Sequence, residues 1–190
     1  MLKEGVNLAR GRKSTFIKRM TSRDETLLKQ LGNTGLCSTE QAKSFCNINR
    51  DRLQKLEKSG YIKIENTIPL NGNMIEVVRL DTKGRAYCEN KLGMEYFYKS
   101  NLNQVTHDLK LTEAYYHIMN DHPGAVWKNE TQISMEHKDL LLDGKDCVDA
   151  VVEVGGESFA VEVIGHKYTQ ETIDNKCTVG NRVAGRTILI

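Results

Sequence analysis

The stretch NINRDRLQKLEKSG, residues 47–60, decides the fold that we predict for the first half of this chain. Leu53 and Leu56 fall on one face of a helix that begins near Asn47 or Asn49. Gly60 is placed to end this helix, because glycine readily adopts the left-handed backbone of a C-cap. The residues that point away from the apolar face are amide-bearing or charged: Asn47, Asp51, Gln54, Lys55 and Lys58, with Arg50 on the flank.

Two shorter helices are predicted upstream. Each begins with a capping box, in which side chains satisfy free N–H groups of the first turn. Ser22 with Glu25 starts a first helix over residues 23–31, and Ser38 with Gln41 starts a short second one. Gly32 and Gly35 are expected to end the first helix. The second helix is expected to bury Ala42 and Phe45.

Downstream of residue 60 the pattern changes to that of a β-hairpin followed by a helix. Residues 61–70 and 74–80 are rich in β-forming residues, and residues 81–93 have a helical pattern. The turn between the strands contains Asn71, Gly72 and Asn73. Three helices, a two-stranded wing and a closing helix, in this order, predict a winged helix-turn-helix over residues 21–92.

A winged helix-turn-helix is typical of proteins that place the third helix in the major groove of DNA and the wing along the backbone. We therefore expect residues 21–100 to form a domain that binds double-stranded DNA. The expected contacts are Asn47, Arg50, Gln54 and Lys55 in the helix, and Asn71 and Asn73 in the wing loop. The alternative is a winged helix that serves only protein contacts.

The charge of the chain is divided between its two halves. Residues 1–100 contain 19 Lys and Arg against 11 Asp and Glu, whereas residues 101–190 contain 8 against 14. Residues 1–20 form a basic arm, which we expect to contact DNA phosphates through Arg10, Arg12 and Lys13, because counterion release favours such binding. The alternative is a solvated terminus without a partner.

Length and composition limit the remaining classes of protein. A chain of 190 residues with this charge division favours two domains, with a boundary near residue 100. No apolar run approaches the ~20 residues that span a bilayer, so no membrane association is expected. The five cysteines are scattered, which indicates neither a disulfide framework nor a zinc ribbon, and we expect a reducing, cytoplasmic location. The five histidines show no paired ligand spacing and are expected to be ordinary surface or capping residues.

The second half has the pattern of a small α/β sandwich. A helix over residues 103–120 is followed by strands, a helix around 169–176 and a last strand. The aromatic cluster in residues 94–103 is expected to be core between the halves, with a base-stacking platform or a dimer contact as alternatives. The four expected strands are residues 126–134, 147–154, 158–165 and 186–190. With the first half, this predicts an α+β chain of two domains.

A pair of glycines sets the register of two of these strands. If Gly155 and Gly156 form a two-residue hairpin turn, Asp149 and Glu162 are equidistant from it and face each other across the ladder. Like charges placed in this way repel each other, so a divalent cation, a lysine or an arginine is expected between them. The opposite face is expected to be core: Ala150, Val152, Val154, Phe159, Val161 and Val163.

A helix that bears Glu113, followed by Asp149 and Glu162 on adjacent strands, resembles the PD-(D/E)XK nuclease fold. The resemblance implies that Asp149 and Glu162 hold Mg²⁺ as metal ligands. Glu113 would complete the catalytic set. It also implies a lysine two residues after the glutamate, which assists the attacking water.

This chain departs from that pattern at the lysine. Ile164 stands at its position, and an apolar side chain can neither orient nor activate a water. Lys167 or Lys176 are the candidates to replace it. We therefore expect residues 101–190 to form a nuclease-like domain that is inactive and needs no cofactor. The alternative is a Mg²⁺-dependent endonuclease, delivered to DNA by the winged helix.

A winged helix followed by a nuclease-like domain resembles replication-relaxation proteins of plasmids and conjugative elements. The stretch FYKSNLNQVTHDLKLTEAYY, residues 97–116, most suggests this family. The resemblance implies a DNA-binding accessory or regulatory protein of a mobile genetic element, which acts in transfer, replication or transcription control. A relaxase, another mobile-element protein and a second copy of the chain are the expected partners besides DNA.

Overall fold

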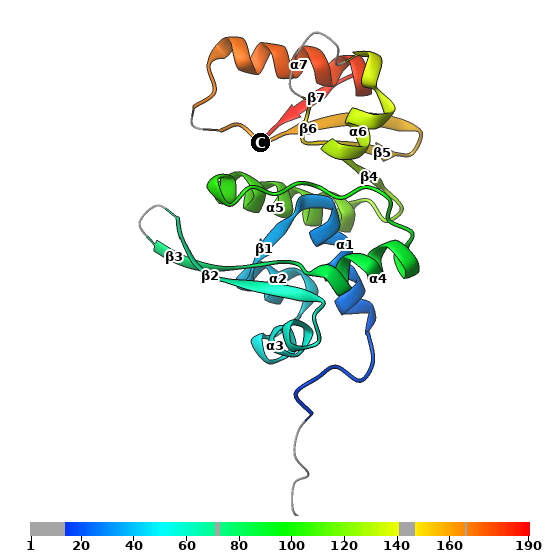
Figure 1. Ribbon diagram of the computed structural model, residues 1–190. Helices are drawn as coiled ribbons and strands as arrows, with labels where there is room; N and C mark the ends of the chain where they lie inside the picture. Colours follow the sequence, from blue (N-terminus) through cyan, green and yellow to red (C-terminus); the bar gives the residue numbers. More distant parts are fainter. Residues whose placement is uncertain (1–13, 71–72, 141–146, 166) are drawn as a thin grey trace, which may run out of the picture.

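The computed structural model describes residues 14–70, 73–140, 147–165 and 167–190 and has a mixed α+β architecture with two small sheets. The first half contains the three helices, the hairpin and the closing helix in the expected order (Figure 1). The hairpin strands are joined by a short third strand, in the order β1-β3-β2. These elements are α1 (Ser22–Thr34), β1 (Leu36–Ser38), α2 (Thr39–Cys46), α3 (Arg50–Lys58), β2 (Ile62–Leu70), β3 (Asn73–Leu80) and α4 (Thr82–Leu92).

The boundaries of the first helices differ from the predicted ones by a few residues. The capping box of α1 is formed by Thr21 and Asp24 and not by Ser22 and Glu25. The helix then continues through Gly32 to its C-cap at Gly35, where φ is 84°. The predicted box at the start of α2 is confirmed, whereas strand β1 was not expected because three residues leave too short a pattern.

The second half contains one long helix, a four-stranded sheet and two further helices. The sheet order is β4-β5-β6-β7, with β6 and β7 parallel and the other neighbours antiparallel. The elements are η1 (Leu102–Gln104), α5 (Val105–Asp121), β4 (Val126–Asn129), α6 (Glu130–Glu136), η2 (Lys138–Leu140), β5 (Ala150–Val154), β6 (Glu157–Glu162), α7 (Gln170–Ala184) and β7 (Thr187–Leu189).

One predicted strand is partly wrong. Residues 126–134 form a strand only as far as Asn129, whose side chain accepts a hydrogen bond from the N–H of Gln132 and so caps helix α6. The helix around residues 169–176 is confirmed but extends to Ala184.

Helices cover both faces of the four-stranded sheet. Helix α7 lies on one face, and α5 lies between the other face and the first half of the chain (Figure 1). Gly180 allows the close approach of α7, because a Cβ there would lie 2.9 Å from Cβ of Ala160 and 2.3 Å from Oγ1 of Thr187. The apolar face predicted for the hairpin is confirmed as core, with five of its residues buried: Ala150, Val152, Phe159, Val161 and Val163.

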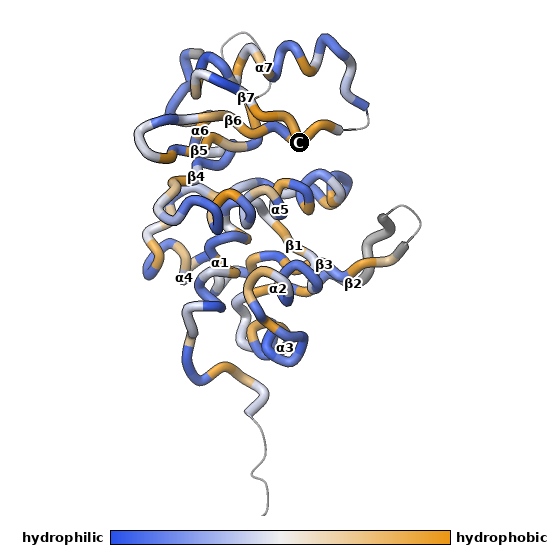
Figure 2. The backbone as a smooth tube through the Cα atoms, turned by 180° about the vertical axis from the view of Figure 1, so that it is seen from behind, coloured by the Kyte–Doolittle hydropathy of each residue, from blue (hydrophilic) through white to orange (hydrophobic). Residues whose placement is uncertain are grey.

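The most extensive hydrophobic cluster among the described residues runs through both halves. It joins residues of α1 and α3 to Tyr115, Trp127 and the sheet. The rings of Tyr115 and Trp127 pack edge to face, 5.1 Å apart. Phe97 is buried in the same core, so the expectation that the aromatic stretch before α5 forms core between the halves is confirmed. Figure 2 shows apolar residues along the four-stranded sheet, whereas α3 is mostly hydrophilic.

Candidate nucleic-acid interface and a buried carboxylate cluster

Helix α3 is oriented by its own sequence. The side chain of Asn49 accepts a hydrogen bond from the N–H of Arg52 and caps the helix. Leu53 and Leu56 are fully buried, as predicted. Because these two residues fix which face packs inward, the opposite face of α3 is directed to solvent, with Gln54 exposed on it.

A buried ion pair holds α3 against α1. Asp24 is 1% exposed, and its Oδ1 accepts a hydrogen bond of 2.9 Å from Nε of Arg52. The same carboxylate accepts bonds from the backbone N–H and the hydroxyl of Thr21. Burial alone would raise the pKa of Asp24, but the bonds from Arg52 and Thr21 outweigh it and lower the pKa. Asp24 therefore acts both as a helix cap and as the partner of α3.

A basic groove lies between α3 and the segment of residues 14–19. It has a volume of about 740 Å³. The segment is tied to the end of α3 by a 3.0 Å hydrogen bond from the N–H of Ile17 to Oγ of Ser59. Asp51 is its one acidic lining residue among the residues that the structure describes, against five basic ones: Lys18, Arg19, Arg52, Lys55 and Lys58.

The structure places only some of the predicted DNA contacts in this groove. Gln54 and Lys55 line it. Arg50 instead pairs with Glu76 of β3, and one of the two contacts, Nη2 to Oε1, measures 2.7 Å. Asn47 is exposed, but it also forms the left-handed C-cap of α2, with φ of 51°. Asn73 begins β3, and the remaining predicted contacts lie outside the described residues: Arg10, Arg12, Lys13 and Asn71.

Four basic lining residues of the groove were not singled out as contacts from the sequence: Lys18, Arg19, Arg52 and Lys58. Lys18 and Arg19 belong to the basic arm, and Lys58 was recognised only as part of the exposed face of α3. The positive charge of the arm is the sequence feature that indicated Lys18 and Arg19. Their position beside α3 depends on the turn at residues 14–20, which has no helical or strand pattern.

The second site is a buried pair of carboxylates at the end of the β5–β6 hairpin. The predicted register is confirmed, since Ala150 pairs with Val161 and the next residues outward are Asp149 and Glu162. The N–H of Asp149 donates to Oε2 of Glu162 at 3.2 Å, and the N–H of Val163 donates to Oδ2 of Asp149 at 2.8 Å. Asp149 is 6% exposed and Glu162 is fully buried.

Lys176 of α7 places a cation beside Glu162, one of these two carboxylates. Its Nζ lies 3.1 Å from Oε1 of Glu162 and donates to the carbonyl of Cys147 at 2.5 Å. The hydroxyl of Tyr168 also donates to Oε1 of Glu162. Burial and the charge of Asp149 raise the pKa of Glu162, and Lys176 opposes that shift. The lysine thus comes from a helix and not from the strand position of Ile164.

A histidine joins this cluster to helix α5. His107 Nε2 lies 3.1 Å from Oδ2 of Asp149, and its Nδ1 lies 3.2 Å from Oδ1 of Asp108. Burial alone would lower the pKa of His107, but hydrogen bonds to the two aspartates outweigh it and raise the pKa to about 10. The hydroxyl of Tyr98 donates to Oδ1 of Asp108. The expectation that every histidine is an ordinary surface or capping residue is therefore wrong for His107.

Two predicted catalytic residues lie apart from the cluster. Glu113 is exposed on α5, 3.9 Å from Nε2 of His117. Lys167 is exposed in the turn before α7. Asp108 is the acidic residue of α5 that joins the cluster, through His107, and the 3.6-residue period alone did not distinguish it from Glu113. In the described part of the chain, no group of three His, Cys, Asp or Glu side chains is placed to hold a metal ion.

Groups of the protein compensate most of the charge of these carboxylates, although Oδ2 of Asp108 is buried without a hydrogen-bond partner among the described residues. Three carboxylates, those of Asp108, Asp149 and Glu162, contact two cationic side chains, those of His107 and Lys176. Hydrogen bonds from backbone N–H groups and Tyr168 occupy further acceptor positions. The arrangement therefore fits a buried structural network better than a set of Mg²⁺ ligands, which keep open positions for water.

No family model, curated protein or solved structure matches this chain. Within the ranges that the structure describes, every helix is too short or too polar to cross a membrane. All five cysteines are free thiols, and four of them are buried.

Proposed function

We propose that the chain is a DNA-binding accessory or regulatory protein of a mobile genetic element, and that it binds double-stranded DNA through a winged helix-turn-helix at residues 21–92. The observation that carries this proposal is the basic groove between α3 and residues 14–19. Of the five cationic side chains that line it, Arg52 is paired with Asp24, and the other four favour a phosphate backbone, which attracts Lys and Arg by counterion release.

The geometry of α3 suits this proposal. Gln54 is exposed on the same helix whose lysines line the groove, so an amide can face base edges while cations contact phosphates. The β2–β3 hairpin extends away from the body beside the helices, as a wing does (Figure 1). The assignment to a mobile element rests on the resemblance of residues 97–116 and on the order of the two halves.

Binding of a short labelled duplex of random sequence, measured by fluorescence anisotropy, tests DNA binding. We expect the double variant Lys55→Ala/Lys58→Ala to bind at least tenfold more weakly at low salt, because two phosphate contacts are lost. The slope of log K against log salt concentration should become shallower by about two.

The matched control is Lys110→Ala/Lys138→Ala, which removes the same charge from exposed positions in the second half. This variant should bind DNA as the wild type does. Equal weakening by both double variants would show a general charge effect and contradict the proposed interface.

Selection of bound sequences from a random duplex pool tests the regulatory role. A palindromic site would indicate a dimeric regulator, and an asymmetric or repeated site would indicate an accessory at an origin. Recovery of no preferred sequence would contradict base reading by Gln54.

A second candidate function, a Mg²⁺-dependent endonuclease, is favoured by one observation. Lys176 lies beside Glu162, which in turn contacts Asp149, so a lysine is near the carboxylate pair, a feature of the nuclease resemblance. Burial and mutual ion pairing weigh against it, so we place this function second.

Incubation of supercoiled and single-stranded DNA with the protein and Mg²⁺ or Mn²⁺ distinguishes the two functions. The first proposal predicts no cleavage. Cleavage that is lost in Glu162→Gln, while DNA binding is retained, would establish the endonuclease.

A further inference from the structure

A groove of about 580 Å³, the α5–β7 groove, lies between helix α5 and strand β7, apart from the basic groove and the carboxylate cluster. Its apolar lining residues are Ala114 and Ile118 of α5, Phe159 of β6, and Ile188 and Ile190. Both isoleucines are exposed, at 39% and 38%. An apolar surface is therefore open to a ligand in this groove.

Strand β7 is one edge of the four-stranded sheet. The hydrogen bonds of its ladder with β6 extend from the carbonyl of Arg186 to the N–H of Ile190, over about 13 Å. Because the hydrogen-bonding groups of successive strand residues alternate in direction, those of Thr187 and Leu189 point away from β6. Within the described part of the chain, no strand pairs with that side of β7. This edge therefore presents backbone donors and acceptors to a further strand.

The two edges of the sheet differ in their protection. The opposite edge strand, β4, carries Lys128, which forms ion pairs with Glu136 and Glu153 at 2.9 and 2.8 Å. Charged side chains of this kind protect an edge from pairing with another chain. The residues of β7, Thr187–Leu189, carry no charge. The edge at β7 is therefore open to an added strand, whereas the edge at β4 is protected.

Cationic side chains line both ends of the α5–β7 groove. Helix α5 and strand β7 run in opposite directions (Figure 1), because the start of α5 contacts the open end of the β5–β6 hairpin, where β7 ends. Lys110 therefore lies toward Ile190, and Arg186 lies toward the end of α5. No carboxylate among the described residues pairs with Lys110 or Arg186. Glu113 is the one acidic side chain in the described lining, and it lies 3.9 Å from Nε2 of His117.

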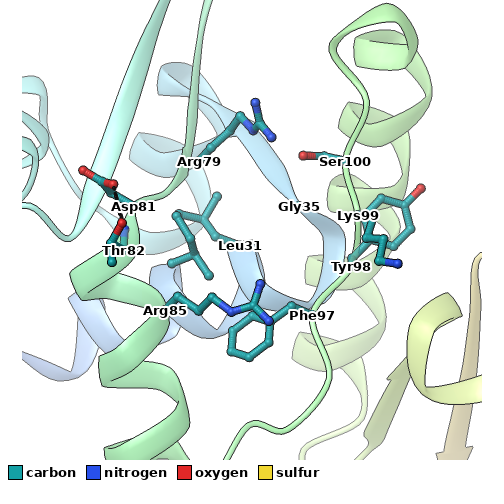
Figure 3. A pocket seen from close by; sticks show the side chains of 11 residues that line it. Leu31, Gly35, Arg79, Asp81, Thr82, Arg85, Phe97, Tyr98, Lys99 and Ser100 are labelled. Carbon is teal, nitrogen blue, oxygen red and sulfur yellow. Dashed lines mark hydrogen bonds between the residues drawn. The ribbon is translucent and has the colours of Figure 1, made fainter. Parts of the chain in front are cut away.

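A second hollow, drawn in Figure 3, carries arginines whose charge is compensated. Arg79 and Arg85 lie apart from each other there, and they are paired with Glu65 and Glu89. Asp81 adds a third carboxylate to that lining. The cations of the α5–β7 groove are in contrast available to an acidic ligand.

We propose that the α5–β7 groove binds an extended peptide segment of a partner protein, which adds to the sheet as a strand beside β7. The backbone of the segment bonds to Thr187 and Leu189. Its alternate apolar side chains cover the two isoleucines, and acidic residues at its ends pair with Arg186 and Lys110. In this mode of recognition, main-chain hydrogen bonds provide affinity and the side chains provide specificity.

A second copy of the chain fits this groove less well. An antiparallel, twofold pairing of two β7 edges brings the Arg186 end of one copy to the Ile190 end of the other, where Lys110 lies. Like charges then meet at both ends of the interface. Charge complementarity therefore favours an acidic partner. The groove contains no residue of α3 or of residues 14–19, so this inference can fail while DNA binding holds.

Fluorescence anisotropy of two labelled peptides, added to the full chain, tests the proposal. Both peptides alternate valine with threonine, and one has glutamate at each end whereas the other has lysine. We expect the acidic peptide to bind about tenfold more tightly than the basic one. Lys110→Glu/Arg186→Glu should reverse this preference, because the basic peptide then gains both ion pairs. Lys138→Glu/Arg182→Glu, which makes the same charge change at exposed positions outside the groove, is the control and should keep it.

Amide hydrogen exchange, followed by nuclear magnetic resonance, tests the addition of a strand. The N–H groups of Thr187 and Leu189 should exchange about tenfold more slowly when the acidic peptide is bound, because they become hydrogen-bonded. An unlabelled DNA duplex should not displace the peptide, since the groove lies apart from α3.

Failure of both peptides to bind at millimolar concentration would overturn the proposal, as would an unchanged preference in Lys110→Glu/Arg186→Glu. Bound peptide with unaltered exchange at Leu189 would contradict strand addition. Displacement by duplex would assign the groove to DNA, and slow exchange at Leu189 in the free protein that quickens on dilution would assign it to a second copy. If the double variant does not fold by circular dichroism, Lys110→Glu alone, at an exposed position, should reduce the preference about threefold.

Discussion

Arg50 lies where helix α3 begins, and its guanidinium group is held by Glu76 of strand β3. Arg50 is 55% exposed, so the pair lies at the surface, where such ion pairs contribute little to stability. The pair matters for DNA binding, because Glu76 places a negative charge beside the helix that we propose to enter the major groove.

Removal of that charge should therefore strengthen DNA binding. In Glu76→Gln, Arg50 is free to contact phosphates, and we expect the affinity for a random duplex to rise roughly fivefold at low salt. The slope of log K against log salt should become steeper by about one, as for one further phosphate contact. Glu89→Gln, which breaks the ion pair of Arg85 on α4, is the matched control. Weaker binding by Glu76→Gln would show that the pair positions the wing instead.

His107 is the second residue whose partners determine its behaviour. Its pKa is raised from 6.5 to about 10 by Asp108 and Asp149, against the effect of burial. A raised pKa means that folding takes up a proton between these values. The resulting stability is fully present below pH 6.5 and is lost as the pH rises toward 10.

We expect the free energy of unfolding of the wild type to fall between pH 7 and 9 more steeply than that of His107→Gln. The difference in slope is at most about 1.4 kcal/mol per pH unit. Urea denaturation at several pH values measures it. His117→Gln, on an exposed face of the same helix, should keep the wild-type slope. A slope unchanged in His107→Gln would mean that His107 is neutral in the folded protein.

At the scale of elements, the position of α3 depends on Asp24 more than on its own cap. Asp24 caps α1 and binds Arg52, so one carboxylate joins the two helices. Asp81, the N-cap of α4, is a useful contrast, since the hydrogen bonds described for its side chain come from the adjacent Thr82.

Asp24→Ala should lower the free energy of unfolding by about 3 kcal/mol or more, because Arg52 loses its partner in a partly buried site. Asp81→Ala should cost about 1 kcal/mol, the usual effect of removing an N-cap. Chemical denaturation checks both values. Equal costs would show that the Arg52 pair contributes nothing beyond capping.

Most elements follow from the sequence because their signals are local. The second capping box, the Gly155–Gly156 hairpin and the glycine at the end of α4 each specify backbone conformation within four residues. The predicted helix and strand boundaries were wrong where neighbouring residues favour different boundaries. Thr21 and Ser22 are both good caps, and Asn129 ends a strand by starting a helix.

The candidate sites were less predictable, because they depend on packing between distant segments. The register of the hairpin placed Asp149 beside Glu162, but only the docking of α7 brings Lys176 to Glu162. Similarly, the choice between Asp108 and Glu113 depends on how α5 is rotated against the sheet.

At the scale of the whole molecule, the charge division suggested two domains, yet one core joins the halves. Gln30 of α1 donates a 3.1 Å hydrogen bond to Thr112 of α5, and both residues are fully buried. Separation of the halves would expose these polar groups together with the apolar core around Trp127.

The chain should therefore unfold in a single transition. Trp127 is the only tryptophan and lies in the shared core, so its fluorescence reports on the second half, while far-ultraviolet circular dichroism reports on all helices. We expect the two signals to coincide in urea. Two separated transitions would contradict a shared core.

In the proposed complex, DNA lies against α3 and residues 14–19. The most direct measurement is photocrosslinking to a labelled duplex, with a benzophenone amino acid placed at Gln54 or, as a control, at Lys138 on the second half. We expect strong crosslinks from position 54, competed by unlabelled duplex, and almost none from position 138. Crosslinks from position 138 with none from position 54 would contradict it.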